Sequence, residues 1–550
     1  MITLGIHAAL TASVHDPAVS VVRNGELIAT IEEERLSRVK TSVALFPERS
    51  LRKILSRFLI DINDVSLIGV DGVTWRDKGK PRITRYIRSM YGECPKIAFY
   101  NHELSHVAGA FFSSPFDRAI CISLDGNGDG LSGLVTICNR NASQPIRILK
   151  SFEMPNSLGV FYTVMTNYLG FRSIEDEFKV MGMAAYGRPV YDLSELLWQS
   201  YDNLGTFYTH PKLWETALMN TTVWEPKCNY ELIQNIIGIG PRLRDAPFNQ
   251  EHFDLAASVQ LAFQKVYISV IEYWLKFTKE RNLVLTGGCA LNCMANKTVC
   301  NLPIDDLYVF PAASDRGLSV GNAYLASSEL GVIPKYSPSP FLGLDYSKEE
   351  VNTAVLNSGL PFTEITKRKD LIFEAASALL GGLVIGWFSG RSELGPRALG
   401  ARSILALASI SGMRDTLNKK IKFREAYRPF APVLLRSDVI DYDIIPKPLT
   451  AMKFMTVNIS VPAGYAHLFS EAMSVDQTAR VQLVSHDEPL FDLLVELKKH
   501  LKIPVLINTS FNLAGEPNVE SPVDAIRTFT SSGLDKLFFD SMIVSKGILA

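Results

Sequence analysis

Residues 101–130 read NHELSHVAGAFFSSPFDRAICISLDGNGDG, a helical pattern followed by a strand that ends in a glycine-rich turn. His102 and His106 are four residues apart and share one face of the predicted helix, with Asn101 at its N-cap position. The strand that follows ends at Asp125. Paired imidazoles near a carboxylate suit a divalent transition metal, and a glycine-rich turn suits a phosphate because bare backbone can approach it closely. The stretch therefore indicates chemistry on a nucleotide.

The same design, a strand followed by a hairpin with a polar turn, occurs twice in the first 140 residues. The first copy has a strand at 3–7 and then an Asn24-Gly25 pair between alternating apolar runs, which is a strong hairpin signal. The second copy is the strand 119–125 and the apolar run after its glycine turn. Actin-like ATPases begin each half of their core in this way, so the pattern favours a duplicated α/β core. The acidic run Glu32–Glu34 is expected to be the solvated start of a helix, with the alternative that one of its carboxylates reaches the substrate.

Two later strands lead into helices through polar loops. Residues 283–292, LVLTGGCALN, pass from strand to helix through paired glycines, which leaves backbone N–H groups to face an anion. A second crossing, LYVFPAASDRGLSVGNAYLAS (307–327), has Asp315 in its loop. The Pro- and Ser-rich stretch 333–340 then predicts a linker.

The part of the chain beyond about residue 350 has basic residues placed among small polar ones. Its basic stretches are RSELGPRALGARS (391–403) and KKIKFREAYRPF (419–430), and INTSFN follows at 507–512. In a chain with a net charge of −1, such stretches are typical of a local cradle for a polyphosphate or an acyl phosphate.

Composition excludes several classes of protein. A chain of 550 residues is too long to fold around a single hydrophobic core, so two or more domains are expected. Its content of 47% hydrophobic and 21% charged residues is ordinary for a soluble enzyme. The net charge of −1 creates no overall electrostatic attraction to nucleic acid or to an anionic membrane. Neither a signal peptide nor an apolar membrane span is expected, and the seven cysteines follow no disulfide framework. We therefore expect a cytoplasmic protein with reduced thiols, in which Cys289 and Cys293 are buried apolar fillers.

Ten ordered blocks, which span nearly the whole chain, resemble the O-carbamoyltransferases of the NodU/CmcH family, some of which carbamoylate antibiotics such as tobramycin. The most specific blocks are SELGPRALGARSI (392–404) and INTSFN. The others are His15-Asp16-Pro17, EEERLSR (32–38), HELSH (102–106), DGNGD (125–129), MGMAAYG (181–187), TGGCALN (286–292), SDRG (314–317) and FREAYRPFAP (423–432).

This resemblance implies an α/β protein with two domains. Residues 1–345 would form a TsaD-like domain of the actin-like ATPase type, and residues 355–550 a YrdC-like domain. The second domain would join carbamoyl phosphate and ATP, with Mg²⁺, into carbamoyl-AMP and release pyrophosphate. The first would transfer the carbamoyl group to a hydroxyl of a small natural product beside Fe(II) or a similar divalent metal. The implied partner is therefore a small molecule and not a nucleic acid or a membrane, and the family also suggests a homodimer.

By the same resemblance, four residues of the first domain become metal ligands. They are His102, His106, Asp125 and Asp315. The two histidines alone would more simply be read as a helix-surface pair. The family often has a second histidine where this chain has Glu103, a change that leaves both histidine ligands in place but alters their surroundings.

Nucleotide contacts are expected from two turns of the first domain, although hairpin geometry and helix entry alone would explain the same residues. His15, in the loop after the first strand, is expected to position or deprotonate the acceptor hydroxyl. The turn residues are Gly126, Gly128, Asp129, Gly287, Gly288 and Asn292.

Basic residues of the second domain are expected around the phosphates of carbamoyl phosphate and ATP. Solvation at the surface is the commonest fate of lysine and arginine, but these lie among small residues and prolines. Asn508, Thr509 and Ser510 follow an apolar strand, so they either cap it or donate hydrogen bonds to nucleotide or carbamoyl oxygens. The basic residues are Lys422, Arg428 and Arg480, which would also carry the chemistry, and Arg397.

Two other functions remain open at this point. Carbamoylation of tRNA, or of a protein thiol, would use the same adenylate chemistry. The hydrogenase-maturation enzyme that modifies a thiol carries an acylphosphatase module and zinc-finger cysteines, which this sequence lacks, and the tRNA systems normally split the two folds between chains. An actin-like sugar kinase or nucleotide-sensing regulator would not need the arginine-rich second domain.

The acceptor molecule is not predicted. Residues 188–250 are the least patterned part of the first domain, and variable surface loops commonly carry specificity. Aromatic residues in this region would either stack on a ring of the acceptor or belong to the core. They are Trp198, Tyr201, Phe207, Tyr208, Trp214 and Trp224.

Overall fold

The computed structural model describes residues 1–10, 14–200, 204–215 and 227–547. The chain forms two compact units: unit 1 is Met1–Ser37 with Thr41–Pro338, and unit 2 is Arg38–Lys40 with Ser339–Ala550. The functional division at residues 345–355 stays a prediction. Across the described ranges, no helix has the length and apolar character of a bilayer-spanning segment.

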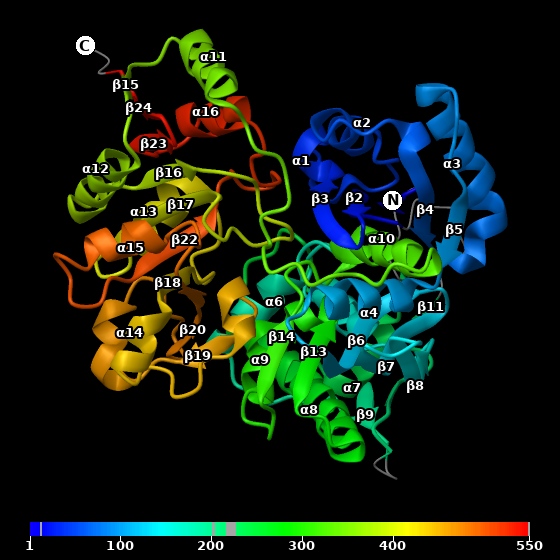
Figure 1. Cartoon of the computed structure of the whole chain (residues 1–550). Helices are drawn as coiled ribbons and strands as arrows, with labels where there is room; N and C mark the ends of the chain where they lie inside the picture. Colours follow the sequence, from blue (N-terminus) through cyan, green and yellow to red (C-terminus); the bar gives the residue numbers. More distant parts are fainter. Residues whose placement is uncertain (11–13, 201–203, 216–226, 548–550) are drawn as a thin grey trace. The chain divides into compact units, whose positions relative to one another are not determined.

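Unit 1 contains two five-stranded sheets (Figure 1). The first sheet has the order β3-β2-β1-β4-β5. Its strands are β1 (Ile2–His7), β2 (Ala18–Arg23), β3 (Glu26–Glu32), β4 (Val65–Asp71) and β5 (Ile97–Tyr100). The second has the order β14-β13-β6-β7-β8. Its strands are β6 (Arg118–Gly128), β7 (Leu131–Asn139), β8 (Ile146–Glu153), β13 (Asn282–Thr286) and β14 (Asp306–Val309).

The two sheets share one topology. In each, the first three strands form an antiparallel meander, a later strand pairs in parallel with the first one, and a further strand pairs in parallel with that later strand. The hairpin predicted at Asn24-Gly25 is confirmed: β2 pairs antiparallel with β3, and both turn residues have positive φ, at 50° and 81°. The repeat confirms the duplicated α/β core of the actin-like type.

Two helices, α4 (His102–Ser113) and α10 (Leu318–Glu329), contact each other, and each also contacts one of the sheets. Helix α10 packs on β1, β2 and β4, whereas α4 packs on β6, β7 and β13 (Figure 1). The close packing depends on small residues. A Cβ on Gly5 of β1 would lie 1.8 Å from the Ser319 carbonyl oxygen, and one on Gly321 would lie 1.9 Å from that of Ser105. This packing fixes α10, and with it Asp315 just before the helix, relative to α4.

The remaining elements of unit 1 lie around this core. Its other helices are α1 (Glu33–Ser37), α2 (Glu48–Arg57), α3 (Arg76–Tyr91), α5 (Leu158–Tyr168), α6 (Glu177–Met183), α7 (Tyr230–Ile237), α8 (Gln250–Thr278) and α9 (Cys293–Val299). Two small ribbons complete it: β9 (Leu197–Gln199) with β10 (Phe207–Thr209), and β11 (Trp214–Glu215) with β12 (Lys227–Cys228).

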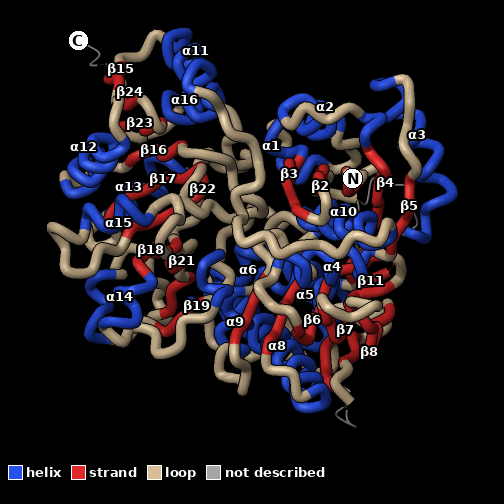
Figure 2. Tube along the Cα trace, viewed as in Figure 1, coloured by secondary structure: helices blue, strands red, loops and turns tan. Residues whose placement is uncertain are grey.

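Unit 2 is built on one eight-stranded mixed sheet with the order β15-β24-β23-β16-β17-β22-β18-β21 (Figure 2). Every residue of β16, β17 and β18 is buried. Because alternate side chains of a strand point to opposite faces, both faces of the sheet are covered there. The strands are β15 (Phe362–Glu364), β16 (Ile385–Phe388), β17 (Arg402–Leu407), β18 (Ala431–Leu435), β21 (Gln482–Val484), β22 (Leu506–Ser510), β23 (Lys536–Phe539) and β24 (Met542–Ser545).

Helices and one ribbon surround this sheet. Helix α12 contacts β16 and β17, and α16 contacts β16 and β23. The helices are α11 (Lys348–Ser358), α12 (Arg368–Leu380), α13 (Met413–Leu417), α14 (Arg436–Asp441), α15 (Phe491–Leu497) and α16 (Pro522–Thr530), and the ribbon pairs β19 (Asn458–Ser460) with β20 (Thr478–Arg480).

Candidate metal centre and cation cluster

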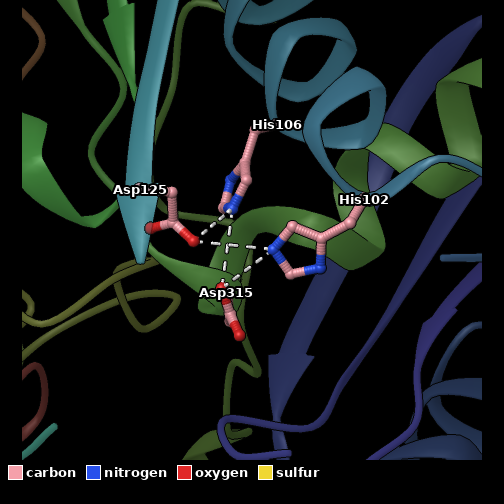
Figure 3. Close-up of side chains that lie close together, drawn as sticks. All are labelled: His102, His106, Asp125 and Asp315. Atoms are coloured by element: carbon pink, nitrogen blue, oxygen red, sulfur yellow. Dashed lines mark ion pairs between the residues drawn. The ribbon is translucent and has the colours of Figure 1, made fainter. Parts of the chain in front are cut away.

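Three elements of unit 1 bring the predicted metal ligands together (Figure 3). His102 and His106 come from consecutive turns of α4, whose N-cap is Asn101 as predicted: its Oδ1 accepts from Leu104 N at 3.2 Å. Asp125 lies near the end of β6, and Asp315 stands three residues before α10. One ligand atom from each of these four side chains lies within 4.8 Å of the other three.

The donor atoms converge on one point. Nε2 of His102 and Nε2 of His106 each lie 3.5 Å from Asp315 Oδ1, and 3.6 Å and 3.7 Å from Asp125 Oδ2. Bonds of about 2.1 Å to a tetrahedral ion would place the ligand atoms about 3.4 Å apart. Both Nε2 atoms are buried and accept or donate no hydrogen bond among the described residues. The cluster, named the four-ligand centre below, therefore fits a divalent cation bound by nitrogen and oxygen.

Without a cation, the charges of this centre are balanced by protons. Burial by itself would lower the pKa of His106, but the nearby carboxylates of Asp125 and Asp315 raise that pKa to about 9. The pKa of His102 is also raised well above its usual value, against the effect of burial, chiefly by Asp315. Burial would raise the pKa of Asp315, yet the two histidines and His15 hold it well below its usual range. A bound cation would replace these protons.

Two predicted turn glycines, Gly128 and Gly288, help to shape the centre, and their contact with a nucleotide stays a prediction. A Cβ on Gly128 would lie 2.1 Å from the His102 ring, so only glycine allows that ring its position. The Gly288 N–H donates to Asp125 Oδ1 at 2.6 Å, which turns the other carboxylate oxygen, Oδ2, toward the histidines. These contacts give both glycines a role in positioning ligands.

The polar turn residues are already engaged within the protein. The Asp129 carboxylate accepts hydrogen bonds from the N–H groups of Val73, Thr74 and His102 and from the Thr74 hydroxyl, at 2.6–3.1 Å. Asn292 caps α9 and exchanges two hydrogen bonds with the Gln260 amide. Their direct contact with a nucleotide stays a prediction, and so does that of Gly126 and Gly287.

His15 lies beside the four-ligand centre. Its Nε2 is 3.8 Å from Asp315 Oδ2, the carboxylate oxygen that does not face the two histidine ligands. Its Nδ1 pairs with Asp16 Oδ2 at 3.1 Å. Burial would lower the pKa of His15, but Asp315 and Asp16 raise it to about 9. The imidazole retains 20% exposure of its side chain.

The acidic run 32–34 was expected to be solvated, and that expectation is wrong. All three carboxylates are buried, with at most 5% exposure. The guanidinium of Arg316 bonds Glu32 Oε2 at 2.9 Å and both oxygens of Glu34, and its Nη2 lies 3.1 Å from Asp16 Oδ1. Arg316 thereby anchors Asp16, the partner of His15, through a buried charge network.

Glu103, which stands where the family often has histidine, is fully buried beside the four-ligand centre. Its Oε2 accepts from the Ser123 hydroxyl at 2.5 Å, and among the described residues its Oε1 has no hydrogen-bond partner. Burial, together with the nearby Asp125 carboxylate, raises the pKa of Glu103 to about 7.

Three of the basic residues predicted in unit 2, Lys422, Arg428 and Arg480, belong to a second cluster. Lys422 is buried, and its Nζ donates to acceptors on Ser510 and Asn512, including Asn512 Oδ1 at 2.8 Å. Burial lowers the pKa of Lys422 well below its usual value, and the charges of Arg424 and Arg428 lower it further. Basic groups that lower one another's pKa in this way are typical of an anion site.

Arg424 was not among the predicted residues. Its Nε donates to Asn418 Oδ1 at 2.9 Å, and its guanidinium lies 4.3 Å from the centroid of the Phe430 ring. Burial lowers the pKa of Arg424 well below its usual value, with further contributions from Arg428 and Arg480. These three arginines and Lys422 are named the cation cluster below. Arg397 lies half-buried in the loop between β16 and β17.

Asn508 is oriented with its oxygen free. Its Nδ2 donates to the Ala398 carbonyl at 3.0 Å and to Gln482 Oε1 at 2.9 Å, so its amide hydrogens are not available to a ligand. Its buried Oδ1 accepts no hydrogen bond among the described residues. Asn508 is therefore suited to accept from an N–H group, where a donor had been expected. Thr509 and Ser510 end the same strand, β22, and are half-buried.

Two further residues near the four-ligand centre carried no predicted role. His7 ends β1 and Asp71 ends β4, and their side chains pair at 2.9 Å. A signal for Asp71 existed, because Val70-Asp71-Gly72 and Leu124-Asp125-Gly126 both end an apolar strand with Asp-Gly. Arg316 gave no comparable signal, since its acidic partners lie far away in the sequence.

The aromatic residues proposed for acceptor binding divide into three groups. Phe207 and Trp214 are buried core residues. Trp198 and Tyr208 lie on the β9–β10 ribbon with ring centroids 6.1 Å apart, and Tyr208 is 41% exposed. Tyr201 and Trp224 lie outside the described residues. Cys289 and Cys293 are buried, as predicted.

Comparison with known proteins decides the family. A family profile described as "Carbamoyltransferase N-terminus" matches residues 80–324, and one described as "Carbamoyltransferase C-terminus" matches residues 376–546. The chain belongs to the carbamoyltransferase family. Nodulation protein NolNO of Sinorhizobium fredii is 33% identical to this carbamoyltransferase, across 97% of this chain and 79% of that protein. Nodulation protein NolO of Bradyrhizobium diazoefficiens is 36% identical, across 81% and 79%.

More distant relatives match over similar lengths. An uncharacterised protein of Methanocaldococcus jannaschii is 28% identical across 97% of this carbamoyltransferase and 98% of its own length. Among solved structures, HypF of T. kodakarensis covers 60% of this chain and 47% of its own, with 14% identity and a TM-score of 0.33. The resemblance read from the ten sequence blocks is confirmed by the family profiles and the nodulation proteins.

Proposed function

We propose that this carbamoyltransferase makes carbamoyl-AMP in unit 2 and uses it in unit 1 to carbamoylate a hydroxyl of a small natural product. The family supports carbamoyl transfer itself. The finer proposal rests on the opposite character of the two clusters, with cations in unit 2 and carboxylates with imidazoles in unit 1. Phosphate chemistry needs the first kind of site, and a divalent metal needs the second.

In unit 2 the substrates would be carbamoyl phosphate and ATP, with Mg²⁺ accompanying ATP. Water would cleave carbamoyl phosphate to carbamate and inorganic phosphate. A carbamate oxygen would then attack the α-phosphorus of ATP and expel pyrophosphate, which accounts for every atom of carbamoyl-AMP. The cation cluster would bind the phosphate oxygens and offset their negative charge. Asn508 Oδ1, which is free of partners among the described residues, would accept from the carbamoyl N–H.

In unit 1 the carbamoyl group would pass to the acceptor. This group is a weak electrophile because its nitrogen donates electrons to the carbonyl, so the leaving group must be good. The four-ligand centre would hold Fe(II) or a similar cation, whose charge would neutralise the negative charge of the AMP phosphate. A cation held by Asp315 would offset the charge that raises the pKa of His15, so that the ring can be neutral. Neutral His15 would then remove the proton of the acceptor hydroxyl as its oxygen attacks the carbonyl carbon, and the bond from that carbon to the AMP oxygen would break. Asp16 would hold the His15 ring in place.

The proposal is tested by separating the two half-reactions. Protein supplied with ATP, Mg²⁺ and carbamoyl phosphate should release AMP-derived products and pyrophosphate. Protein supplied with carbamoyl-AMP and a panel of hydroxyl-bearing natural products should yield an acceptor that mass spectrometry shows to carry one carbamoyl group. Release of ADP without pyrophosphate would instead indicate kinase chemistry, and carbamoylated tRNA or protein would indicate the alternative acceptors.

A further inference from the structure

The ring of His102 faces two different groups through its two nitrogens. Nε2 points into the four-ligand centre, whereas Nδ1 points away from it (Figure 3). Nδ1 lies 3.7 Å from Oδ2 of Asp71, a buried residue at the end of β4. The ring also packs against Gly128, where even a Cβ would collide with it. The orientation of the ring is therefore fixed by its surroundings.

The Asp71 carboxylate is itself held in place by residues of two other elements. His7 of β1 contacts both of its oxygens, at 2.9 Å and 3.0 Å. The Asn322 amide of α10 donates to Oδ1 at 2.8 Å. Asn322 is fixed in turn, because it donates to the Ile6 carbonyl at 3.0 Å and accepts from the Ser105 hydroxyl of α4 at 2.7 Å. Asp71 therefore lies at a defined position relative to α4.

A simpler explanation is that Asp71 only balances the charge of His7. Both nitrogens of His7 face acceptors, Asp71 and the His15 carbonyl oxygen at 2.8 Å, so both carry protons and the ring needs an anionic partner. That explanation does not require Asp71 to lie beside a metal ligand. A neutral imidazole binds a metal through the nitrogen that has no proton, so the proton of His102 must be on Nδ1. A carboxylate beside Nδ1 favours that tautomer.

We propose that Asp71 is a positioning residue for the metal: it keeps the proton of His102 on Nδ1 and thereby presents Nε2 to the cation, while His7 and Asn322 hold Asp71 in place. This inference rests on the metal centre of the proposed function and concerns binding of the cation, not the transfer reaction.

The test measures metal affinity without any substrate. Metal-stripped full-length protein is titrated with Co²⁺, whose visible absorption reports its ligands. Asp71→Asn should weaken Co²⁺ binding by about 10- to 100-fold, the usual effect of removing such a carboxylate. Asp77→Asn is the matched control, because Asp77 has 95% of its side chain exposed, and it should bind as the unmodified protein does.

Asp71→Asn leaves a charged His7 without its partner and so risks misfolding. The double variant with His7→Gln and Asp71→Asn removes both charges, and it should fold, keep its metal-free melting temperature close to normal and still bind Co²⁺ about 10- to 100-fold more weakly. Normal Co²⁺ affinity in either folded variant would overturn the role of Asp71 alone. Failure of the unmodified protein to bind Co²⁺ or Fe²⁺ would overturn the metal centre and this role with it.

Discussion

The four-ligand centre of unit 1 and the cation cluster of unit 2 are both groups of charged side chains, but carboxylates and imidazoles form the first, whereas a lysine and arginines form the second. In unit 1, the carboxylates are balanced by protons on imidazoles, so the pKa of His106 is raised to about 9 against the effect of burial. In unit 2, burial and mutual repulsion lower the pKa values of Lys422 and Arg424. The first cluster is therefore suited to a cation and the second to an anion. Each site would be completed only by its ligand, and the two can be disabled one at a time.

The largest expected effect comes from removing a ligand of the metal centre. His106→Ala should reduce transfer from supplied carbamoyl-AMP by at least about 1,000-fold, because the cation supplies several kcal/mol of charge stabilisation. Pyrophosphate release in unit 2 should stay normal. His486→Ala, which changes a histidine with 75% of its side chain exposed, should affect neither half-reaction. Loss of both half-reactions in a folded His106→Ala protein would contradict the assignment of the two half-reactions to separate units.

The corresponding experiment in unit 2 removes a residue of the cation cluster. Lys422→Ala should lower carbamoyl-AMP formation by at least about 100-fold, since a buried cation that stabilises phosphate charge is removed. Transfer from supplied carbamoyl-AMP should remain. Lys419→Ala is the control, because Lys419 is nearby in sequence and has 76% of its side chain exposed. Equal loss of both activities from Lys422→Ala would mean that the clusters do not act separately.

Within unit 1, the proposed base can be separated from the metal ligands. His15→Asn should slow transfer from carbamoyl-AMP by about 100-fold or more, a typical contribution of general-base catalysis. Co²⁺ affinity should stay close to normal, because His15 lies outside the four-ligand centre. Full transfer activity in this variant, measured with a saturating acceptor, would exclude His15 as the base.

The smallest effect is a pH dependence of metal binding. The pKa of His106 is raised to about 9 by Asp125 and Asp315, although burial opposes the shift, so below that pH the metal must displace a proton. Co²⁺ affinity should therefore rise by about tenfold or more per pH unit between pH 6.5 and 8.5. Equilibrium titrations at several pH values check this slope. A flat profile would show that the histidines are already neutral in the metal-free protein.

Sequence reasoning succeeded where local patterns carry the information. The Asn24-Gly25 turn sets its hairpin through positive φ at two adjacent residues, and the spacing of His102 and His106 sets their shared helix face. Asp125 could be placed at the edge of a sheet because it follows an apolar strand. Each of these features depends on residues that are close together in the chain.

The features that the sequence did not predict correctly depend on contacts with residues that are distant in the chain. Glu32 and Glu34 look like a solvated helix start, and only Arg316, supplied by the turn before α10, makes them part of the interior. Asp71 is a single acid at a strand end, and its place beside His102 follows from the packing of α4, α10 and β4. For Asn508, the hydrogen bonds to Ala398 and Gln482 decide which end of the amide is free. Local patterns do not encode such contacts.

The central claim is that unit 2 builds a mixed anhydride of carbamate and AMP. It is tested most directly by exchange of labelled pyrophosphate into ATP, measured with purified full-length protein, Mg²⁺ and no acceptor. The account predicts exchange that requires carbamoyl phosphate, persists in His106→Ala and disappears in Lys422→Ala. Active protein that transfers a carbamoyl group to its acceptor, yet shows no exchange and releases no pyrophosphate, would contradict it.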